Sequence, residues 1–113
     1  MTTLVTAIIR PHALDAVKAA LSGVGVTGLT LTEVRGFGRQ GGHTETYRGA
    51  EYTVDLLPKL KVEVVVAGED VSTAVKAIAD AARSDRIGDG KIWTTEVGSV
   101  TRIRTGEVGE DAL

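Results

Sequence analysis

The stretch KLKVEVVV, which runs from Lys59 to Val66, decides the fold of this 113-residue chain. Its even-numbered positions are all apolar, whereas its odd-numbered positions are charged as far as Glu63. An alternation with a period of two residues is typical of a β-strand that buries one face. We therefore predict a strand here, with one solvated end.

Two more strands and a helix are predicted before this stretch. Residues 4–10 are apolar and β-branched, which favours a buried strand that ends at Pro11, where a helix can begin. Apolar residues then recur at helical spacing from residue 14 to residue 24, and the nearby glycines at 23 and 25 are typical of a helix end. Residues 28–37 alternate again with a period of two and predict a second strand.

A second helix and two strands are predicted after it. Asp70 is a suitable N-cap for a helix whose apolar positions, between Val71 and Ala82, fall on one face. Residues 91–97 predict a fourth strand, and residues 100–104 predict a short extra C-terminal strand. The order β-α-β-β-α-β is that of the ferredoxin-like fold, an α+β sandwich with both helices on one face of an antiparallel sheet. The other face of such a sheet must be covered or solvated.

Length and composition limit the possible functions. A chain of 113 residues is a single domain, residues 1–113. Its net charge of −2 gives no broad attraction to nucleic acid or to anionic membranes. The sequence has no cysteine, which excludes disulfides and thiolate catalysis. It shows no signal peptide, and its longest apolar run is far shorter than the roughly 20 residues that span a bilayer. We therefore expect a cytoplasmic protein.

Residues 36–52 separate the second and third predicted strands and show no core periodicity. They contain five of the 14 glycines and both tyrosines. A small domain that keeps an irregular insertion of about 20 residues between strands usually uses it for binding. We expect a docking loop without regular structure.

Two glycine-rich segments have the chemistry of phosphate binding. In GFGRQ, residues 36–40, the glycines let the backbone approach a ligand, and Arg39 offers a planar fork suited to phosphate. In IGDGK, residues 87–91, backbone N–H groups would form a cradle, with Lys91 as a point charge. This second segment opens a strand, so it is neither a Walker A motif nor a dinucleotide fingerprint. Each segment also fits a plain glycine turn followed by a solvated cation.

Arg102 and Arg104 form a third candidate feature. They are two residues apart, so on a strand both side chains face the same side. Two like charges side by side are unfavourable unless an anion or a carboxylate lies between them. The pair is therefore either a triphosphate clamp or a solvated sheet edge that pairs with Glu107 or Glu110.

Three segments resemble the PII signal-transduction proteins, which report nitrogen and energy status. Residues 36–52 resemble the family's T-loop, residues 86–92 its second signature, and residues 102–107 its closing strand. The resemblance extends from Leu4 to the C-terminus without gaps. It implies a homotrimer of ferredoxin-like subunits, a T-loop at about residues 38–58, and a regulator rather than an enzyme.

The resemblance also implies ligands, namely ATP or ADP in the cleft between neighbouring subunits, and 2-oxoglutarate beside Mg²⁺ at the base of the T-loop. The positions that match the ATP/ADP site are Ile8, Thr30, Gly36, Phe37, Gly38, Arg39, Gln40, Val65, Gly88, Asp89, Gly90, Lys91, Arg102 and Arg104. The positions that match the 2-oxoglutarate site are Gln40, Gly41, Lys59 and Gly88, and Gln40 also matches the Mg²⁺ ligand. A divalent cation there would offset the repulsion between a dicarboxylate and a triphosphate.

Two positions in the T-loop match residues that act on partners. Tyr52 matches the tyrosine that the family presents for covalent nucleotidylation, although it also fits a half-buried tyrosine at the start of a strand. Arg48 matches an arginine that plugs the pore of an ammonium channel, although it also fits a solvated arginine. The implied partners are the ammonium channel, a nucleotidyltransferase and enzymes of nitrogen metabolism. Nucleic acid is not among them, and a membrane would be reached only through the channel.

The chain departs from the family pattern in two places. Gly41 stands where the family often has lysine, which removes a positive charge near the effector site. Residues 82–86 replace a more common Thr-Gly-Lys-like approach to the Gly-Asp-Gly segment, and we expect little consequence from this change.

Other classes of function fit less well. An RNA recognition motif has the same order of elements but needs stacked aromatic residues, and only 4% of this chain is aromatic. A phosphotransfer enzyme needs a base or nucleophile, for which no residue is evident. The nearest alternative is a PII-like sensor of a different metabolite, and the intact Gln40, Lys59 and Tyr52 argue against it.

Overall fold

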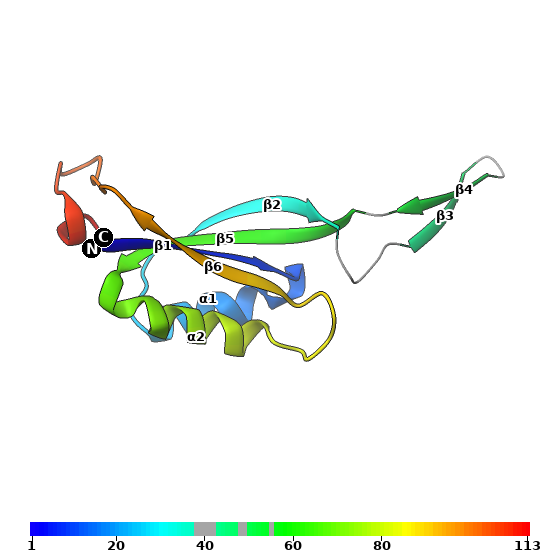
Figure 1. Cartoon of the computed structure of the whole chain (residues 1–113), viewed down its shortest axis with the longest axis horizontal. Helices are drawn as coiled ribbons and strands as arrows, with labels where there is room; N and C mark the ends of the chain where they lie inside the picture. The colour runs from blue at the N-terminus through cyan, green and yellow to red at the C-terminus, as the bar shows by residue number, and fades with distance from the viewer. Residues whose placement is uncertain (38–42, 48–49, 55) are drawn as a thin grey trace.

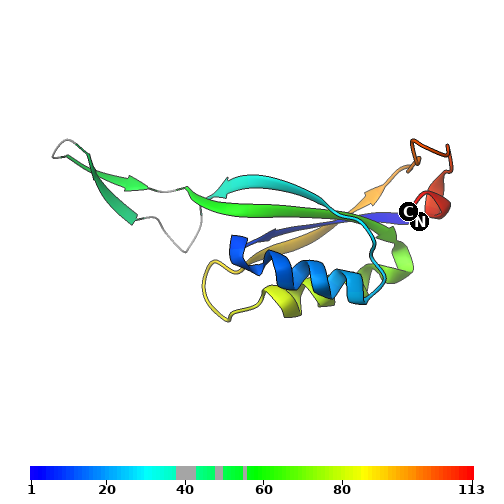
Figure 2. The ribbon, with the colours of Figure 1, turned by 180° about the vertical axis from the view of Figure 1, so that it is seen from behind.

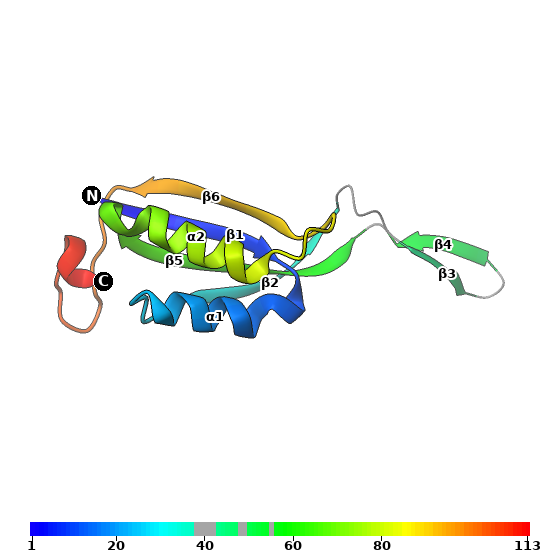
Figure 3. The ribbon, with the colours of Figure 1, turned by 90° about the horizontal axis from the view of Figure 1, so that it is seen from below.

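The computed structural model of the chain describes residues 1–37, 43–47, 50–54 and 56–113. Its main sheet has four strands in the order β2-β5-β1-β6, and every neighbouring pair is antiparallel. The strands are β1 (Thr2–Ile9), β2 (Thr30–Gly36), β5 (Leu57–Ala67) and β6 (Gly90–Val97). The helices α1 (Leu14–Gly23) and α2 (Val71–Ala82) lie side by side on one face of this sheet (Figure 1, Figure 3). The predicted ferredoxin-like fold is confirmed.

The core lies between the two central strands and the two helices. β5 alternates as predicted, with Val62, Val64 and Val66 buried beneath the helices, and Val5, Ala7 and Ile9 of the predicted buried strand β1 lie beside them. The helices contribute Val17, Leu21, Ala74 and Ile78. The face away from the helices is more mixed, because Thr6 is buried there while Val65 and Trp93 stay exposed.

The helices begin differently from the sequence prediction. Pro11 starts a short 3₁₀ turn, η1 (Pro11–Ala13), that leads into α1, and a second turn, η2 (Gly68–Asp70), leads into α2. Asp70 stands at the N-cap position of α2, but its side chain makes no capping hydrogen bond. Gly25, with a φ of 89°, follows the end of α1 as expected for a glycine terminator. No helix in the described part of the chain is long and apolar enough to cross a membrane.

A hairpin corrects our expectation that the insertion has no regular structure. β3 (His43–Tyr47) pairs antiparallel with β4 (Ala50–Val54) in a separate two-stranded sheet. The hairpin projects from one end of the main sheet, and the longest extent of the chain is 59 Å (Figure 1, Figure 2). The prediction missed it because the stretch HTETY in β3 is polar at almost every position, so it has no apolar periodicity although threonine and tyrosine favour strands.

The short C-terminal strand predicted at residues 100–104 is not formed. Thr101 makes only an isolated bridge with Val108, and the chain turns between them. The turn is closed by hydrogen bonds from the N–H of Arg102 to the carbonyl of Glu107 and from the N–H of Gly106 to the carbonyl of Arg102, both of 2.8 Å. Because the chain reverses on itself, these residues cannot extend along the main sheet. The turn lies near both termini, at the end opposite the hairpin (Figure 1).

Candidate functional site

A cleft of about 540 Å³ lies at the hairpin end of the main sheet, on the face away from the helices. It is lined by Ile8, Gly36, Phe37, Leu57, Lys59, Ile87, Gly88, Gly90, Lys91 and Trp93. The cleft therefore collects residues from all four strands and from the loop that connects α2 to β6, residues 83–89. A smaller hollow of about 400 Å³ lies beside α2, on the other side of this loop.

The cleft brings together many of the residues predicted from the sequence. The predicted residues that line it are Ile8, Gly36, Phe37, Lys59, Gly88, Gly90 and Lys91. Thr30 and Val65 do not line it, although by register they share its sheet face. Gly38, Arg39, Gln40, Gly41 and Arg48 lie outside the described residues. Tyr52 is on β4 of the hairpin.

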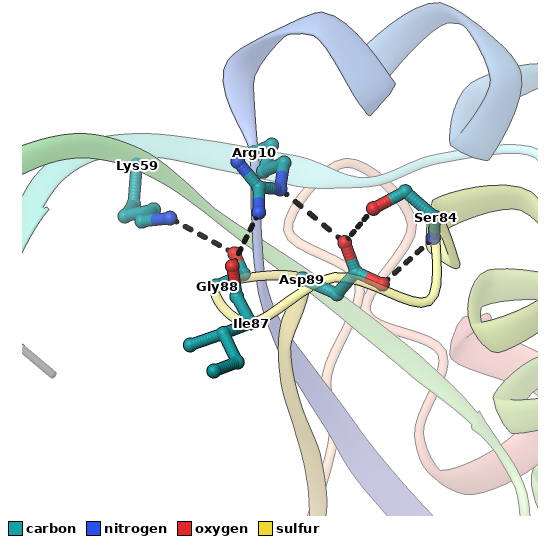
Figure 4. A network of polar contacts seen from close by, with 6 residues as sticks. All are labelled: Arg10, Lys59, Ser84, Ile87, Gly88 and Asp89. Carbon is teal, nitrogen blue, oxygen red and sulfur yellow. Dashed lines mark hydrogen bonds and ion pairs between the residues drawn. The ribbon is translucent and has the colours of Figure 1, made fainter. Parts of the chain in front are cut away.

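The loop before β6 is fixed by contacts on both sides (Figure 4). The Arg10 guanidinium donates to the Ile87 carbonyl at 2.6 Å and to the Asp89 carboxylate at 3.3 Å. The Lys59 ammonium donates to the Gly88 carbonyl at 2.9 Å. The Asp89 carboxylate also accepts from the Ser84 N–H at 2.7 Å and from the Ser84 hydroxyl. Lys59 of β5 and Arg10, the residue that follows β1, thus hold the loop beside the cleft.

Two ionisable groups at the loop have shifted pKa values. Hydrogen bonds from Ser84, and then the Arg10 guanidinium, hold the pKa of Asp89 well below its usual range. Burial, and then the Arg10 charge, lower the pKa of the Lys59 ammonium, while Asp89 opposes that shift. Asp89 is therefore ionised across the physiological pH range, whereas burial makes the charged form of Lys59 less stable than it would be in water.

The two arginines near the C-terminus do not reach this cleft. Arg102 forms an ion pair with Glu107 at 3.1 Å and donates to the Leu113 carbonyl at 2.5 Å, so within this chain it makes the carboxylate contact of the second alternative, although in a turn and not at a sheet edge. Arg104 is exposed. Both follow the far end of β6 (Figure 1), whereas the residues of β6 that line the cleft lie in its first half. A ligand in this chain's cleft could meet such arginines only if another subunit supplied them.

Sequence reasoning missed Arg10, Ser84 and Asp85. Arg10 ends a strand and Ser84 lies in a connecting loop, so no motif marks them, and their roles depend on contacts with residue 89. Asp85 has a φ of 63°, the only positive φ among non-glycine residues in the described ranges. We expected little consequence from the departure at residues 82–86. The segment nevertheless contains both Ser84, which anchors the Asp89 carboxylate, and Asp85 with its strained backbone.

We predict that glycine at position 85 is more stabilising than alanine. The left-handed conformation costs an L-residue about 1 kcal/mol or more, a cost that glycine avoids. In urea unfolding, Asp85→Gly should exceed Asp85→Ala in free energy of unfolding by about 1 kcal/mol. The control is Lys18, exposed within α1, where the alanine variant should be more stable than the glycine variant by a similar amount. If the alanine variant were the more stable one at both positions, the strain at Asp85 would be contradicted.

Comparisons with known proteins identify similar proteins by sequence and by structure. Residues 2–107 match the protein family described as Nitrogen regulatory protein P-II. Among curated proteins, the chain is 61% identical over 109 residues to the Nitrogen regulatory protein P-II of Cereibacter sphaeroides, covering 96% of this chain and 97% of that protein. The protein of that name from Rhizobium meliloti (strain 1021) is 60% identical with the same coverage of both chains.

A solved structure has the same fold. The crystal structure of Arabidopsis thaliana PII bound to citrate superposes with a TM-score of 0.82 at 37% sequence identity, covering 99% of this chain and 92% of that chain.

Proposed function

The chain belongs to the nitrogen regulatory protein P-II family, and from that premise we propose that it is a sensor of nitrogen and energy status that binds ATP or ADP and 2-oxoglutarate. The observation that carries the proposal is the cleft, in which the glycine-rich loop before β6 lies beside Lys59 and Lys91. The protein acts as a regulator of other proteins, in the cytoplasm, and is not itself an enzyme.

We propose that the cleft is one half of a nucleotide site completed by a neighbouring subunit. Phe37 and Trp93 are exposed apolar walls suited to a flat base, and Lys91 is a cation suited to phosphate. The matched arginines, Arg102 and Arg104, follow the end of β6 that is opposite the cleft. A trimer in which each subunit offers its arginines to the next cleft would bring the two halves together.

We propose that the second ligand, 2-oxoglutarate, binds beside the nucleotide at Lys59 and Gly88. No group of three acidic or histidine side chains among the described residues is placed to hold a metal. A Mg²⁺ ion would therefore be bound chiefly by ligand oxygens, together with Gln40, which lies outside the described residues. The citrate bound to the Arabidopsis relative, a small polycarboxylate, supports a carboxylate ligand for this fold.

We propose that the hairpin is the docking arm of the T-loop. It projects away from the main sheet, and a two-stranded sheet alone is only marginally stable, so a partner can readily reshape it (Figure 2). Tyr52 on β4 is then the site of nucleotidylation, and Arg48 a contact to an ammonium channel. A nucleotidyltransferase and enzymes of nitrogen metabolism are the other partners.

The test is a calorimetric titration with each ligand in turn. If ATP-bound Mg²⁺ forms part of the second site, 2-oxoglutarate should bind at least about tenfold more tightly when ATP and Mg²⁺ are present. ADP should not substitute for ATP, because it lacks the γ-phosphate that helps hold the metal. Trp93, the single tryptophan, lines the cleft and should report nucleotide binding by its fluorescence.

Citrate and EDTA are the controls for this titration. Removing Mg²⁺ with EDTA should abolish the linkage between the two ligands. Citrate tested in place of 2-oxoglutarate separates a sensor of 2-oxoglutarate from a sensor of another carboxylate. Equal affinity for 2-oxoglutarate with and without ATP and Mg²⁺ would contradict the proposed mechanism.

A further inference from the structure

Asp89 faces away from the cleft that its neighbours line. Gly88, Gly90 and Lys91 line the 540 Å³ cleft, and the last two also line the smaller hollow beside α2, whereas Asp89 lines only that hollow. A carboxylate is also a poor neighbour for a bound phosphate, because like charges repel. Direct contact between Asp89 and an anionic ligand is therefore unfavourable on both geometric and electrostatic grounds.

The Asp89 carboxylate instead closes the loop onto itself and onto β1. It accepts both the N–H and the hydroxyl of Ser84, five residues earlier, and so ties the two ends of the loop together (Figure 4). It also accepts from Arg10, whose guanidinium in turn holds the Ile87 carbonyl. The side chains of Asp89 and Arg10 are 21% and 19% exposed.

We propose that Asp89 is a positioning residue that, through Ser84 and Arg10, fixes the loop in its binding conformation before ligand arrives. Because a peptide group is planar and trans, the Ile87 carbonyl that points at Arg10 sets the direction of the Gly88 N–H, which must point the opposite way. We call the contacts of the Asp89 carboxylate with Ser84 and Arg10 the latch. A loop without the latch would have to become ordered when the ligand binds, and the entropic cost of that ordering reduces affinity. The proposal rests on the proposed function for the identity of the ligand, ATP.

The experiment compares Asp89→Asn with Asp85→Asn, and only the first should weaken ATP binding. Both substitutions remove one negative charge from the same loop, and electrostatics alone predicts tighter ATP binding for each. Only Asp89→Asn breaks the latch, because an amide cannot accept hydrogen bonds at both of its polar atoms. We expect Asp89→Asn to weaken ATP binding by about tenfold, the scale of one charge-assisted contact, and Asp85→Asn to leave it unchanged or tighter.

Ser84 provides a second, milder test of the same contact. Ser84→Ala should weaken ATP binding. Ser84→Thr, which keeps the hydroxyl, should bind ATP as the wild type does. The losses for Ser84→Ala and Asp89→Asn should not add in the double variant, since both remove one interaction. Thermal unfolding of each variant shows whether the domain stays folded.

Hydrogen exchange of the free protein tests the latch without any ligand. Amides of residues 84–89 should exchange faster in Asp89→Asn than in the wild type and in Asp85→Asn. If the wild type does not bind ATP, the proposed function fails, while the exchange result still decides whether Asp89 orders the loop. The proposal is overturned if Asp89→Asn leaves exchange in the loop unchanged, or if both Asn variants shift ATP affinity alike.

Discussion

Gly90→Ala is expected to lower the free energy of unfolding by about 3 kcal/mol or more and to abolish nucleotide binding. Gly90 has a φ of 107°, a conformation that L-residues rarely adopt, and a Cβ at this position would lie 1.7 Å from the Ile8 carbonyl oxygen. Backbone strain of this kind alone costs about 1–3 kcal/mol. The clash adds to it, because β1 is a central strand and cannot move without opening the core.

The effect on binding follows from where Gly90 lies. It is the first residue of β6, it pairs with Ile9 of β1, and it lines the cleft next to Lys91. If the start of β6 separates from β1, Lys91 and the preceding loop move away from Ile8 together. Stability should be measured by urea unfolding, and binding by Trp93 fluorescence under conditions in which the variant is folded.

Gly98→Ala is the matched control for this variant. Gly98 directly follows the other end of β6, has no positive φ, and would place a Cβ in open space. This substitution should change the free energy of unfolding by no more than about 0.5 kcal/mol. Equal effects of the two variants would mean that glycine is not required at the start of β6.

The central part of the fold could be predicted because burial leaves a pattern in the sequence. β1 and β5 lie in the middle of the sheet: β5 alternates because one of its faces is covered, and β1 is marked by its apolar, β-branched run. β3 and β4 form a separate two-stranded sheet, and the polar sequence of β3 has no apolar periodicity that could have predicted it. The predicted C-terminal strand was wrong because the turn that closes between Arg102 and Glu107 outweighs the strand pattern of the residues before it.

The site could be predicted only as far as its motifs extend. The glycines and Lys91 of the second segment all line the cleft. They could be predicted together because they are contiguous in the sequence. Arg10 contacts Asp89 across 79 residues of chain, a pairing that no local pattern encodes. The roles of the residues in the T-loop, of both C-terminal arginines and of the implied trimer stay predictions.

Lys59→Met is expected to weaken 2-oxoglutarate binding without destabilising the protein. The loss should be about 2 kcal/mol, or roughly 30-fold in affinity, for one charge-assisted contact to a carboxylate. The affinity for ATP should change by less than about threefold, since Lys91 remains for the phosphates. Lys61→Met is the matched control, because Lys61 lies on the same face of β5 but does not line the cleft.

The stability of this variant follows from the sign of the pKa shift. Burial lowers the pKa of Lys59, so the folded protein holds this proton less tightly than the unfolded chain does. The stability of the wild type should therefore rise with pH through the window between the folded pKa and the unfolded value of about 10.4, and Lys59→Met should lack that rise.

At neutral pH the buried charge costs stability, so the methionine variant should be as stable as the wild type or more stable, although the Gly88 carbonyl loses a donor. Lys59 thus carries a charge that burial disfavours, at the edge of a cleft. This is the pattern expected of a lysine that binds an anionic ligand. A fall of more than about 2 kcal/mol in the free energy of unfolding at pH 7, with 2-oxoglutarate affinity unchanged, would instead make Lys59 a structural support for the loop before β6.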